Sequence, residues 1–131
     1  MNVVEYMADF STILVLDDEE LITESLEMLL EDEFNVLTFN SPVDALKEVS
    51  ANTDIRMVIS DYKMPHMNGC EFLQEVKEYN PNIYRMILSG YADAKTLMRS
   101  VTDGTVQKFL TKPWEPEILL TIIKQICQRA G

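Results

Sequence analysis

The chain has 131 residues, 47% of them hydrophobic, and its 22 acidic side chains outnumber 11 basic ones, for a formal net charge of -11. This composition predicts one compact domain rather than a disordered or fibrous chain, and its charge argues against direct binding to nucleic acid or to an anionic membrane. No apolar run is long enough to span a bilayer and no secretory signal is recognisable, so a cytoplasmic protein with reduced thiols at Cys70 and Cys127 is expected.

The N-terminal half alternates short apolar runs with helical patterns. Residues 1–11 precede the first run and are expected to form an extension, which leaves 12–131 as the domain. Strands are predicted at 13–16, 36–39 and 57–60, because each run is short, apolar and followed by polar residues. Residues 22–30 repeat apolar side chains at helical spacing, and Ser41 with Pro42 marks the start of a second helix.

The C-terminal half continues the same alternation. Asn68 and Gly69 are predicted to form a turn before a helix that ends ahead of Pro81. Strands are predicted at 84–88 and 107–111, and the apolar spacing in 94–101 and 119–126 predicts two further helices. Five strand-then-helix units predict an α/β fold, a doubly wound parallel sheet of order 2-1-3-4-5 with five helices.

Polar side chains follow four of these strands at the point where each strand ends. Asp17 and Asp18 follow the first strand, Asp61 the third, Ser89 the fourth and Lys112 the fifth. The carboxyl ends of parallel strands share one edge of a sheet, where ligands bind near the point at which the strand order reverses. These side chains are therefore expected to meet.

The charges of this predicted cluster indicate a metal site. A pair of like charges 4 Å apart costs roughly 4 kcal/mol at an effective dielectric constant of 20, so three carboxylates beside one ammonium call for a further cation. An all-oxygen site suits Mg²⁺, with Mn²⁺ or Ca²⁺ as alternatives, and the lack of Cys and His ligands at this edge argues against zinc. A carboxylate, a hydroxyl and an ammonium around Mg²⁺ are typical of sites that handle a phosphoryl group.

Four segments in this order resemble the receiver domain of bacterial two-component response regulators (the CheY-like family). They are residues 13–19, 58–69, 86–90 and 109–113, and the resemblance covers residues 12–128. It implies a signalling module rather than an enzyme, although such domains assist their own phosphorylation and dephosphorylation.

The resemblance also implies a role for each residue at the strand ends. Asp61 is expected to accept phosphate, with Asp18 as a direct Mg²⁺ ligand and Asp17 acting through water or by orienting the site. The main-chain carbonyl of Lys63 is a further expected ligand. Two phosphoryl-binding residues and a cis peptide bond complete the implied set: Ser89 and Lys112, and Lys112–Pro113.

An implied switch connects this site to a binding surface. Phosphorylation is expected to draw the Ser89 hydroxyl toward the phosphoryl group and to admit the ring of Phe109 into the vacated space. The output surface then comprises the fourth helix, the fifth strand and the fifth helix. Expected partners are a sensor histidine kinase or phosphotransfer protein, an output domain or downstream protein, and a second copy in a phosphorylation-dependent homodimer. Tyr91 is expected to shield the site partly.

Two other functions remain as alternatives. A haloacid-dehalogenase-type phosphatase also places an Asp nucleophile and Mg²⁺ at strand ends, but it needs the nucleophile at Asp17 and a general acid at Glu19. A receiver-like domain that only docks partners is the second alternative, and the complete set of site residues argues against it. The acidic residues of the first helix are expected to form either a solvent-exposed face or a docking face for a partner with a basic rim.

Overall fold

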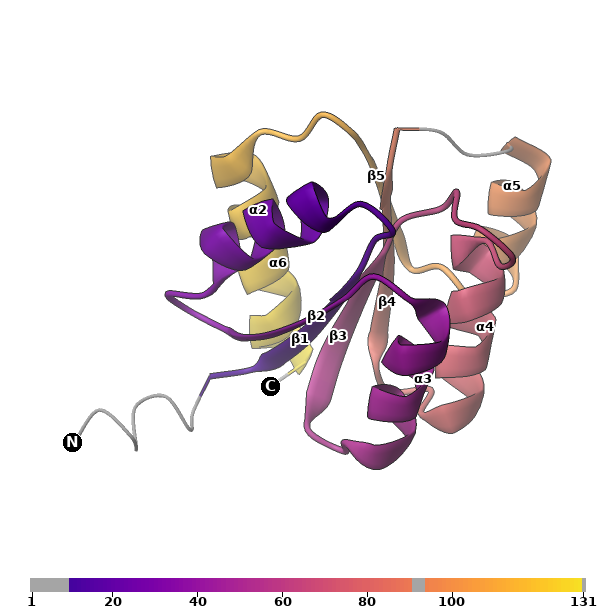
Figure 1. Cartoon of the computed structure of the whole chain (residues 1–131), viewed down its shortest axis with the longest axis horizontal. Coiled ribbons are helices and arrows are strands. Elements are labelled where there is room, and N and C mark those ends of the chain that lie inside the picture. Colours follow the sequence, from indigo (N-terminus) through magenta and orange to yellow (C-terminus); the bar gives the residue numbers. More distant parts are fainter. Residues whose placement is uncertain (1–9, 91–93, 131) are drawn as a thin grey trace.

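The computed structural model describes residues 10–90 and 94–130, which form a parallel sheet covered by helices (Figure 1). The strands are β1 (Thr12–Leu16), β2 (Asn35–Phe39), β3 (Ile55–Ser60), β4 (Tyr84–Ser89) and β5 (Lys108–Thr111). The helices are α2 (Glu20–Leu30), α3 (Pro42–Ala51), α4 (Gly69–Tyr79), α5 (Ala94–Thr102) and α6 (Pro116–Ala130). No described helix has the length and apolar character needed to cross a membrane.

The sheet has the order β2-β1-β3-β4-β5, and all four strand pairs are parallel. This confirms the predicted fold class and strand order. The winding reverses between β1 and β3, which lie side by side in the centre. Their carboxyl ends, with those of β4 and β5, form the edge at which ligands bind in sheets of this kind.

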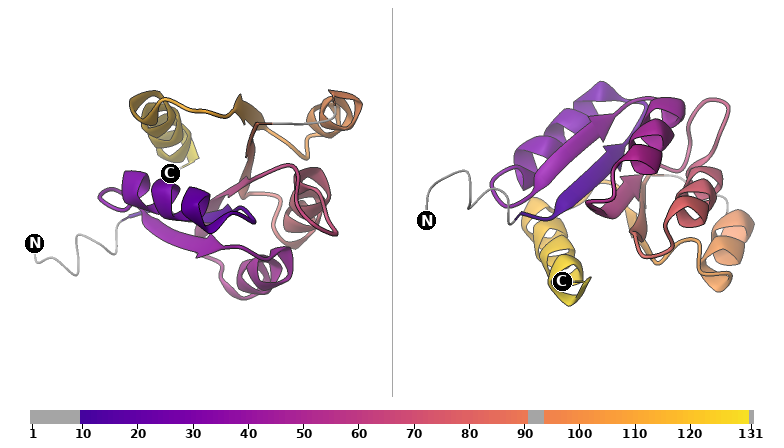
Figure 2. Two further views of the ribbon diagram at one scale, coloured as in Figure 1. Left: turned by 45° about the horizontal axis from the view of Figure 1, so that its top comes forward. Right: turned by 90° about the horizontal axis from the view of Figure 1, so that it is seen from below.

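Two helical layers bury both faces of the sheet. Helices α2 and α6 cover one face, and α3, α4 and α5 cover the other (Figures 1 and 2). Side chains of β1 alternate between the two cores: Ile13 and Val15 pack with α2 and α6, whereas Leu14 and Leu16 pack with α3 and α4. All four are 0–1% exposed. Such continuous burial explains why the strand is an unbroken apolar run.

The residues before α4 cap the helix rather than forming a separate turn. The Asn68 side chain accepts a hydrogen bond from the Glu71 amide (2.9 Å), and the Glu71 carboxylate accepts one from the Asn68 amide (3.0 Å). This capping box makes Gly69 the first residue of α4. The prediction of a turn at Asn68 and Gly69 is corrected accordingly.

The expected N-terminal extension falls mostly outside the described residues. Of its members only Phe10 and Ser11 are described, and both bond to the first residue of β2. The Asn35 side chain donates to the Phe10 carbonyl (3.0 Å) and the Asn35 amide to the Ser11 carbonyl (2.9 Å). These two residues therefore attach to the amino end of the sheet.

Both cysteines are free, buried thiols, and burial raises the pKa of each above its usual value. In the unfolded chain a thiol ionises near pH 8.5. Between that pH and the higher folded-state pKa, the folded protein retains protons that the unfolded chain has lost, so stability falls as pH rises. We expect the free energy of unfolding to fall by up to about 1.4 kcal/mol per pH unit for each thiol. Urea unfolding of the wild type and Cys127→Ala between about pH 8 and 10 measures this slope, and equal slopes would contradict the prediction for Cys127.

Candidate functional site

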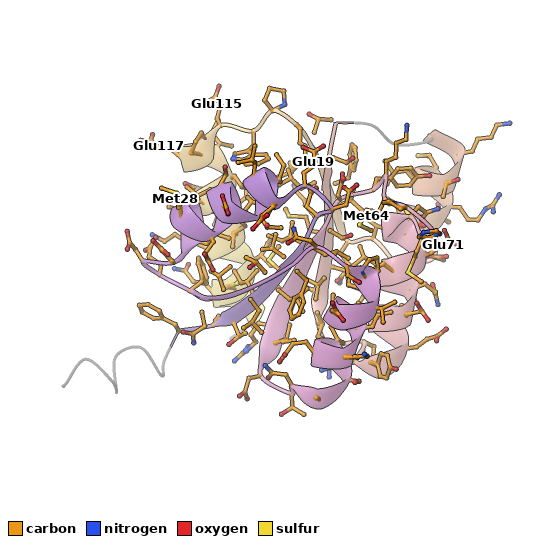
Figure 3. The ribbon with its side chains drawn as sticks, viewed as in Figure 1. Glu19, Met28, Met64, Glu71, Glu115 and Glu117 are labelled. Carbon is orange, nitrogen blue, oxygen red and sulfur yellow. The ribbon has the colours of Figure 1, made fainter. Side chains whose placement is uncertain are left out.

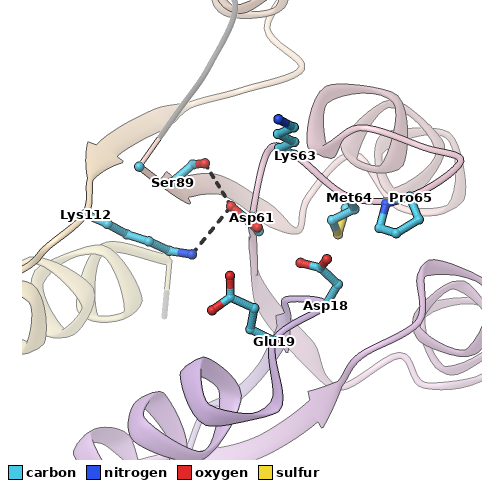
Figure 4. A pocket seen from close by; sticks show the side chains of 9 residues that line it. Asp18, Glu19, Asp61, Lys63, Met64, Pro65, Ser89 and Lys112 are labelled. Carbon is cyan, nitrogen blue, oxygen red and sulfur yellow. Dashed lines mark hydrogen bonds and ion pairs between the residues drawn. The ribbon is translucent and has the colours of Figure 1, made fainter.

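The carboxyl ends of the central strands surround a hollow of about 580 Å³ (Figure 4). Asp18 follows β1, Asp61 follows β3, Ser89 ends β4 and Lys112 follows β5, and all four line the hollow. The predicted cluster is thus brought together at one edge. The remaining lining residues come from the segments that follow these strands: Glu19, Lys63, Met64, Pro65 and Gly90.

Asp61 lies at the centre of the cluster, and several hydrogen-bond donors approach one of its carboxylate oxygens. Its Oδ1 accepts hydrogen bonds from the Ser89 hydroxyl (2.8 Å) and the Tyr62 amide (2.9 Å). Lys112 Nζ lies 3.5 Å from the same atom. Asp61 is 8% exposed and opens onto the hollow. A nearly buried carboxylate that faces an open hollow is accessible to a ligand.

Asp17 lies beneath this surface, and both of its carboxylate oxygens have partners. Lys112 donates to Oδ2 (2.8 Å) and the Glu19 amide donates to Oδ1 (2.9 Å). The Asn40 side chain, after β2, also donates to the Asp17 carbonyl (2.8 Å). Asp17 is 2% exposed, so these bonds hold its side chain in place below the surface.

Lys112 bridges the two buried carboxylates. Burial by itself lowers the pKa of Lys112, but the hydrogen bond to Asp17 and the charges of Asp17 and Asp61 outweigh it, so the pKa lies above its usual value. The Lys112 amide also donates to the Ser89 carbonyl (3.0 Å), and the Lys112–Pro113 peptide bond is cis. The ammonium group is therefore protonated at neutral pH and directed toward the acidic cluster.

The three aspartates suit a divalent cation. One carboxylate oxygen from each of Asp17, Asp18 and Asp61 lies within 4.8 Å of the others. Three negative charges face the single charge of Lys112, so the cluster keeps an excess of two. Because carboxylate oxygens are the ligands that Mg²⁺ prefers, these donors fit that ion.

Gly69 fixes the main chain of Asp61 by close packing. The Gly69 amide donates to the Tyr62 carbonyl (2.7 Å). A Cβ atom at position 69 would lie 2.2 Å from the Asp61 carbonyl oxygen and 2.8 Å from Ile87 Cδ1. Only glycine allows this approach, so Gly69 helps to position the Asp61 carboxylate. Sequence reasoning missed this role because Gly69 reads locally as a turn residue.

The predicted switch residues lie on neighbouring strands. The Ser89 hydroxyl donates its hydrogen bond to the Asp61 carboxylate. Phe109 pairs with Ile87 across β4 and β5, is half-buried, and packs against the core on the α3–α5 side. The expectation for Tyr91 lies outside the described residues.

The family model of the response regulator receiver domain matches residues 13–124. The hydrogenase transcriptional regulatory protein HoxA of Cupriavidus necator is 33% identical over 121 residues, 92% of this chain and 25% of that protein, so the chain spans about a quarter of its length. A response regulator receiver domain protein from Clostridium thermocellum superposes with a TM-score of 0.84 at 33% identity, covering 92% of this chain and 96% of that one. The beryllofluoride-activated NtrC4 receiver domain dimer gives a TM-score of 0.82 at 28% identity, covering 93% and 100%.

Proposed function

The chain belongs to the response regulator receiver domain family, and on that premise we propose that Asp61 accepts a phosphoryl group from the phosphohistidine of a sensor kinase or phosphotransfer protein. One observation carries the proposal: the Asp61 carboxylate opens onto the hollow while Ser89 and Lys112 approach it from two other strands. The product is a signalling state of this domain, consistent with the family's role as a signalling domain.

The transfer is an in-line displacement at phosphorus. An Asp61 carboxylate oxygen forms the new P–O bond as the P–N bond to the donor imidazole breaks, and the leaving imidazole nitrogen takes up a proton from solvent. Ser89 and Lys112 donate hydrogen bonds to the phosphoryl oxygens. These hydrogen bonds stabilise the negative charge on the oxygens in the transition state. Hydrolysis by water reverses the modification and releases inorganic phosphate.

Asp18, Asp61 and the main-chain carbonyl of Lys63 would hold Mg²⁺ directly, with Asp17 acting through water. The ion, when bound, supplies charge neutralisation at the phosphoryl oxygens and helps to orient them. Mn²⁺ and Ca²⁺ also accept oxygen ligands and are proposed as substitutes.

Asp18→Asn is expected to weaken Mg²⁺ binding about tenfold or more, because it removes one charged ligand and about 1.4 kcal/mol corresponds to each factor of ten. Titration calorimetry measures the dissociation constant. Glu19→Gln is the matched control, since it removes the same charge from the adjacent exposed residue, whose carboxylate is not among the three clustered groups. Equal losses in both variants would show a general charge effect and refute Asp18 as a ligand.

Lys112→Ala is expected to leave Mg²⁺ binding intact and to uncouple Phe109 from Asp61. The ammonium contacts Asp17 and Asp61, so its loss removes the link between the phosphoryl group and β5 without removing a metal ligand. Ring proton shifts of Phe109 in NMR spectra, recorded before and after phosphorylation, measure the coupling. Identical shift changes in the wild type and in Lys112→Ala would contradict this role.

Two surfaces are proposed for partners. On α2, Leu21 and Met28 are 76% and 73% exposed, and Met28 lies at the surface of the molecule (Figure 3). Their acidic neighbours suit a kinase or phosphotransfer helix with apolar contacts and a basic rim. The output surface would be α5, β5 and α6, directed to an output domain, a downstream protein or a second copy. The similarity to the NtrC4 receiver domain dimer supports the phosphorylation-dependent homodimer as a proposal.

The arrangement favours Asp61 over Asp17 as nucleophile, in contrast to a haloacid-dehalogenase-type phosphatase. Asp17 is 2% exposed, both of its oxygens have donors, and it does not line the hollow. Asp61 does line the hollow, and its hydrogen bonds converge on Oδ1.

Incubation with acetyl phosphate tests the proposal, with intact mass as the readout. One added phosphoryl group is expected with Mg²⁺ and none with a chelator. Asp17→Asn, which keeps Asp61, is expected to retain some modification at a reduced rate. Complete loss in Asp17→Asn, combined with persistent modification in a variant lacking the Asp61 carboxylate, would favour the phosphatase instead.

A further inference from the structure

Arg85 is a buried cation on the same face of β4 as the switch residue Ser89. It is 3% exposed, and Arg85, Ile87 and Ser89 alternate along one side of the strand. Within residues 10–90 and 94–130, its guanidinium donates to four main-chain carbonyls. Nε donates to Thr105 (2.8 Å), Nη1 to Pro81 (3.0 Å) and Ile83 (2.7 Å), and Nη2 to Gly104 (2.9 Å).

These carbonyls belong to the segments that leave two helices. Pro81 and Ile83 follow the end of α4, and Gly104 and Thr105 follow the end of α5. A helix carries partial negative charge at its C-terminal end, so one cation between two such ends stabilises both. The four bonds also compensate for desolvation of the guanidinium, a cost that burial of a charged group otherwise carries.

Two side chains of α4 tie the same turn in place. Lys77 Nζ donates to the Asp103 carbonyl (3.0 Å), and the Thr105 hydroxyl donates to Gln74 Oε1 (2.6 Å). Together with Arg85, they join residues 103–105 to α4 and β4. We call this set of contacts the α5 anchor. It fixes the C-terminal end of α5 and the start of β5.

A groove runs between α4 and the body of α5. A hollow of about 490 Å³ lies between α4 and α5, and it is lined on the α5 side by Thr96, Arg99 and Ser100. Its α4 side includes the buried Cys70. The hollow is also lined by Gln74 and therefore reaches the α5 anchor. The bonds of the anchor hold α5 at its C-terminal end.

We propose that Arg85 is a positioning residue of the switch: it holds the C-terminal end of α5, so that a change at Ser89 displaces the N-terminal end of the helix about a fixed point. The proposal rests on the function proposed above, because Ser89 must respond to the phosphoryl group. Residues 90–93 connect Ser89 to α5, so a displacement of Ser89 reaches the N-terminal end first. The output surface then changes by a tilt of α5 rather than by a shift of the whole helix.

NMR spectra with Mg²⁺ and beryllofluoride, a phosphoryl analogue, test this directly. In the wild type, amide shift changes at 94–98 are expected to be several-fold larger than those at 103–106, and the Arg85 Nε–H signal is expected to persist in both states. In Arg85→Met the changes are expected to spread to 103–106. Val106→Ala is the matched control, because it makes a cavity beside the same turn at a residue 1% exposed and leaves the anchor bonds in place, so it is expected to keep the wild-type gradient.

Even shift changes along α5 in the wild type would overturn the inference, as would an unaltered gradient in Arg85→Met. The wild-type gradient decides the matter even if Arg85→Met fails to fold. If the amide shift changes also spread to 103–106 in Val106→Ala, then general loosening of this turn, and not loss of the anchor bonds, would explain the spread seen in Arg85→Met. Absence of any change at Asp61 and Ser89 would instead overturn the proposed function, and this inference with it.

Discussion

Asp61→Asn is expected to abolish phosphoryl uptake from acetyl phosphate while preserving the fold. The amide retains an oxygen that can accept the hydrogen bonds of Ser89 and Tyr62, but it is a very poor nucleophile compared with a carboxylate. The intact mass is therefore expected to stay unmodified under conditions that convert the wild type. Circular dichroism verifies that the variant remains folded.

The same substitution is expected to stabilise the metal-free protein slightly. It removes one of three carboxylates whose oxygens lie within 4.8 Å of one another, which relieves a repulsion on the order of 1 kcal/mol. In return, the variant is expected to lose most of the stabilisation that Mg²⁺ gives the wild type. Asp44→Asn, at an exposed position of α3, is the control for a change of charge alone. A variant that still gains stability from Mg²⁺ as the wild type does would exclude Asp61 from the metal site.

Gly69→Ala is expected to cost about 3 kcal/mol of stability and to slow phosphoryl uptake about 100-fold. The added Cβ would lie 2.2 Å from the Asp61 carbonyl oxygen, so the main chain of Asp61 must move. Gly69 lies in α4 without a positive φ, where alanine would otherwise favour the helix by up to about 1 kcal/mol. A loss of stability therefore measures the close approach and not helix propensity.

Two further variants separate the sources of this effect. Gly90→Ala places its Cβ in ordinary contact, 3.8 Å from Lys112 Cβ, and is expected to change stability by less than about 0.5 kcal/mol. Adding Ile87→Val to Gly69→Ala removes the Cδ1 atom that the new Cβ would meet at 2.8 Å but not the main-chain contact. We expect no recovery of uptake. Full recovery in that double variant, measured by the rate of mass increase, would assign the effect to Ile87 packing instead of the Asp61 main chain.

The topology and most of the cluster could be predicted because they depend on local patterns. Unbroken apolar runs marked strands buried on both faces, and acidic or basic residues directly after them marked the strand ends. Once the strands were taken as parallel, the side chains of Asp18, Asp61 and Lys112 had to lie near one another. The structure places them around one hollow, whereas their roles in phosphoryl transfer remain proposals.

Features that depend on distant main chain could not be predicted in this way. Arg85 looks like a single charged residue in a strand, and its partners at Gly104 and Thr105 lie 19 and 20 residues away along the chain. The Asn40 bond to the Asp17 carbonyl spans 23 residues and depends on how β2 ends beside β1. The contact at Gly69 likewise exists only after α4 packs beneath the loop that follows Asp61. None of these has a pattern of spacing that a sequence can reveal.

Chemical mapping of the modified residue tests the central claim most directly. Borohydride reduces an aspartyl phosphate to homoserine, which tandem mass spectrometry can locate in a peptide. After treatment with acetyl phosphate and Mg²⁺, we expect homoserine at position 61 and nowhere else, with none when the divalent cation is chelated. Homoserine at position 17 or 18, or equal conversion of Asp61 with and without the cation, would contradict the account.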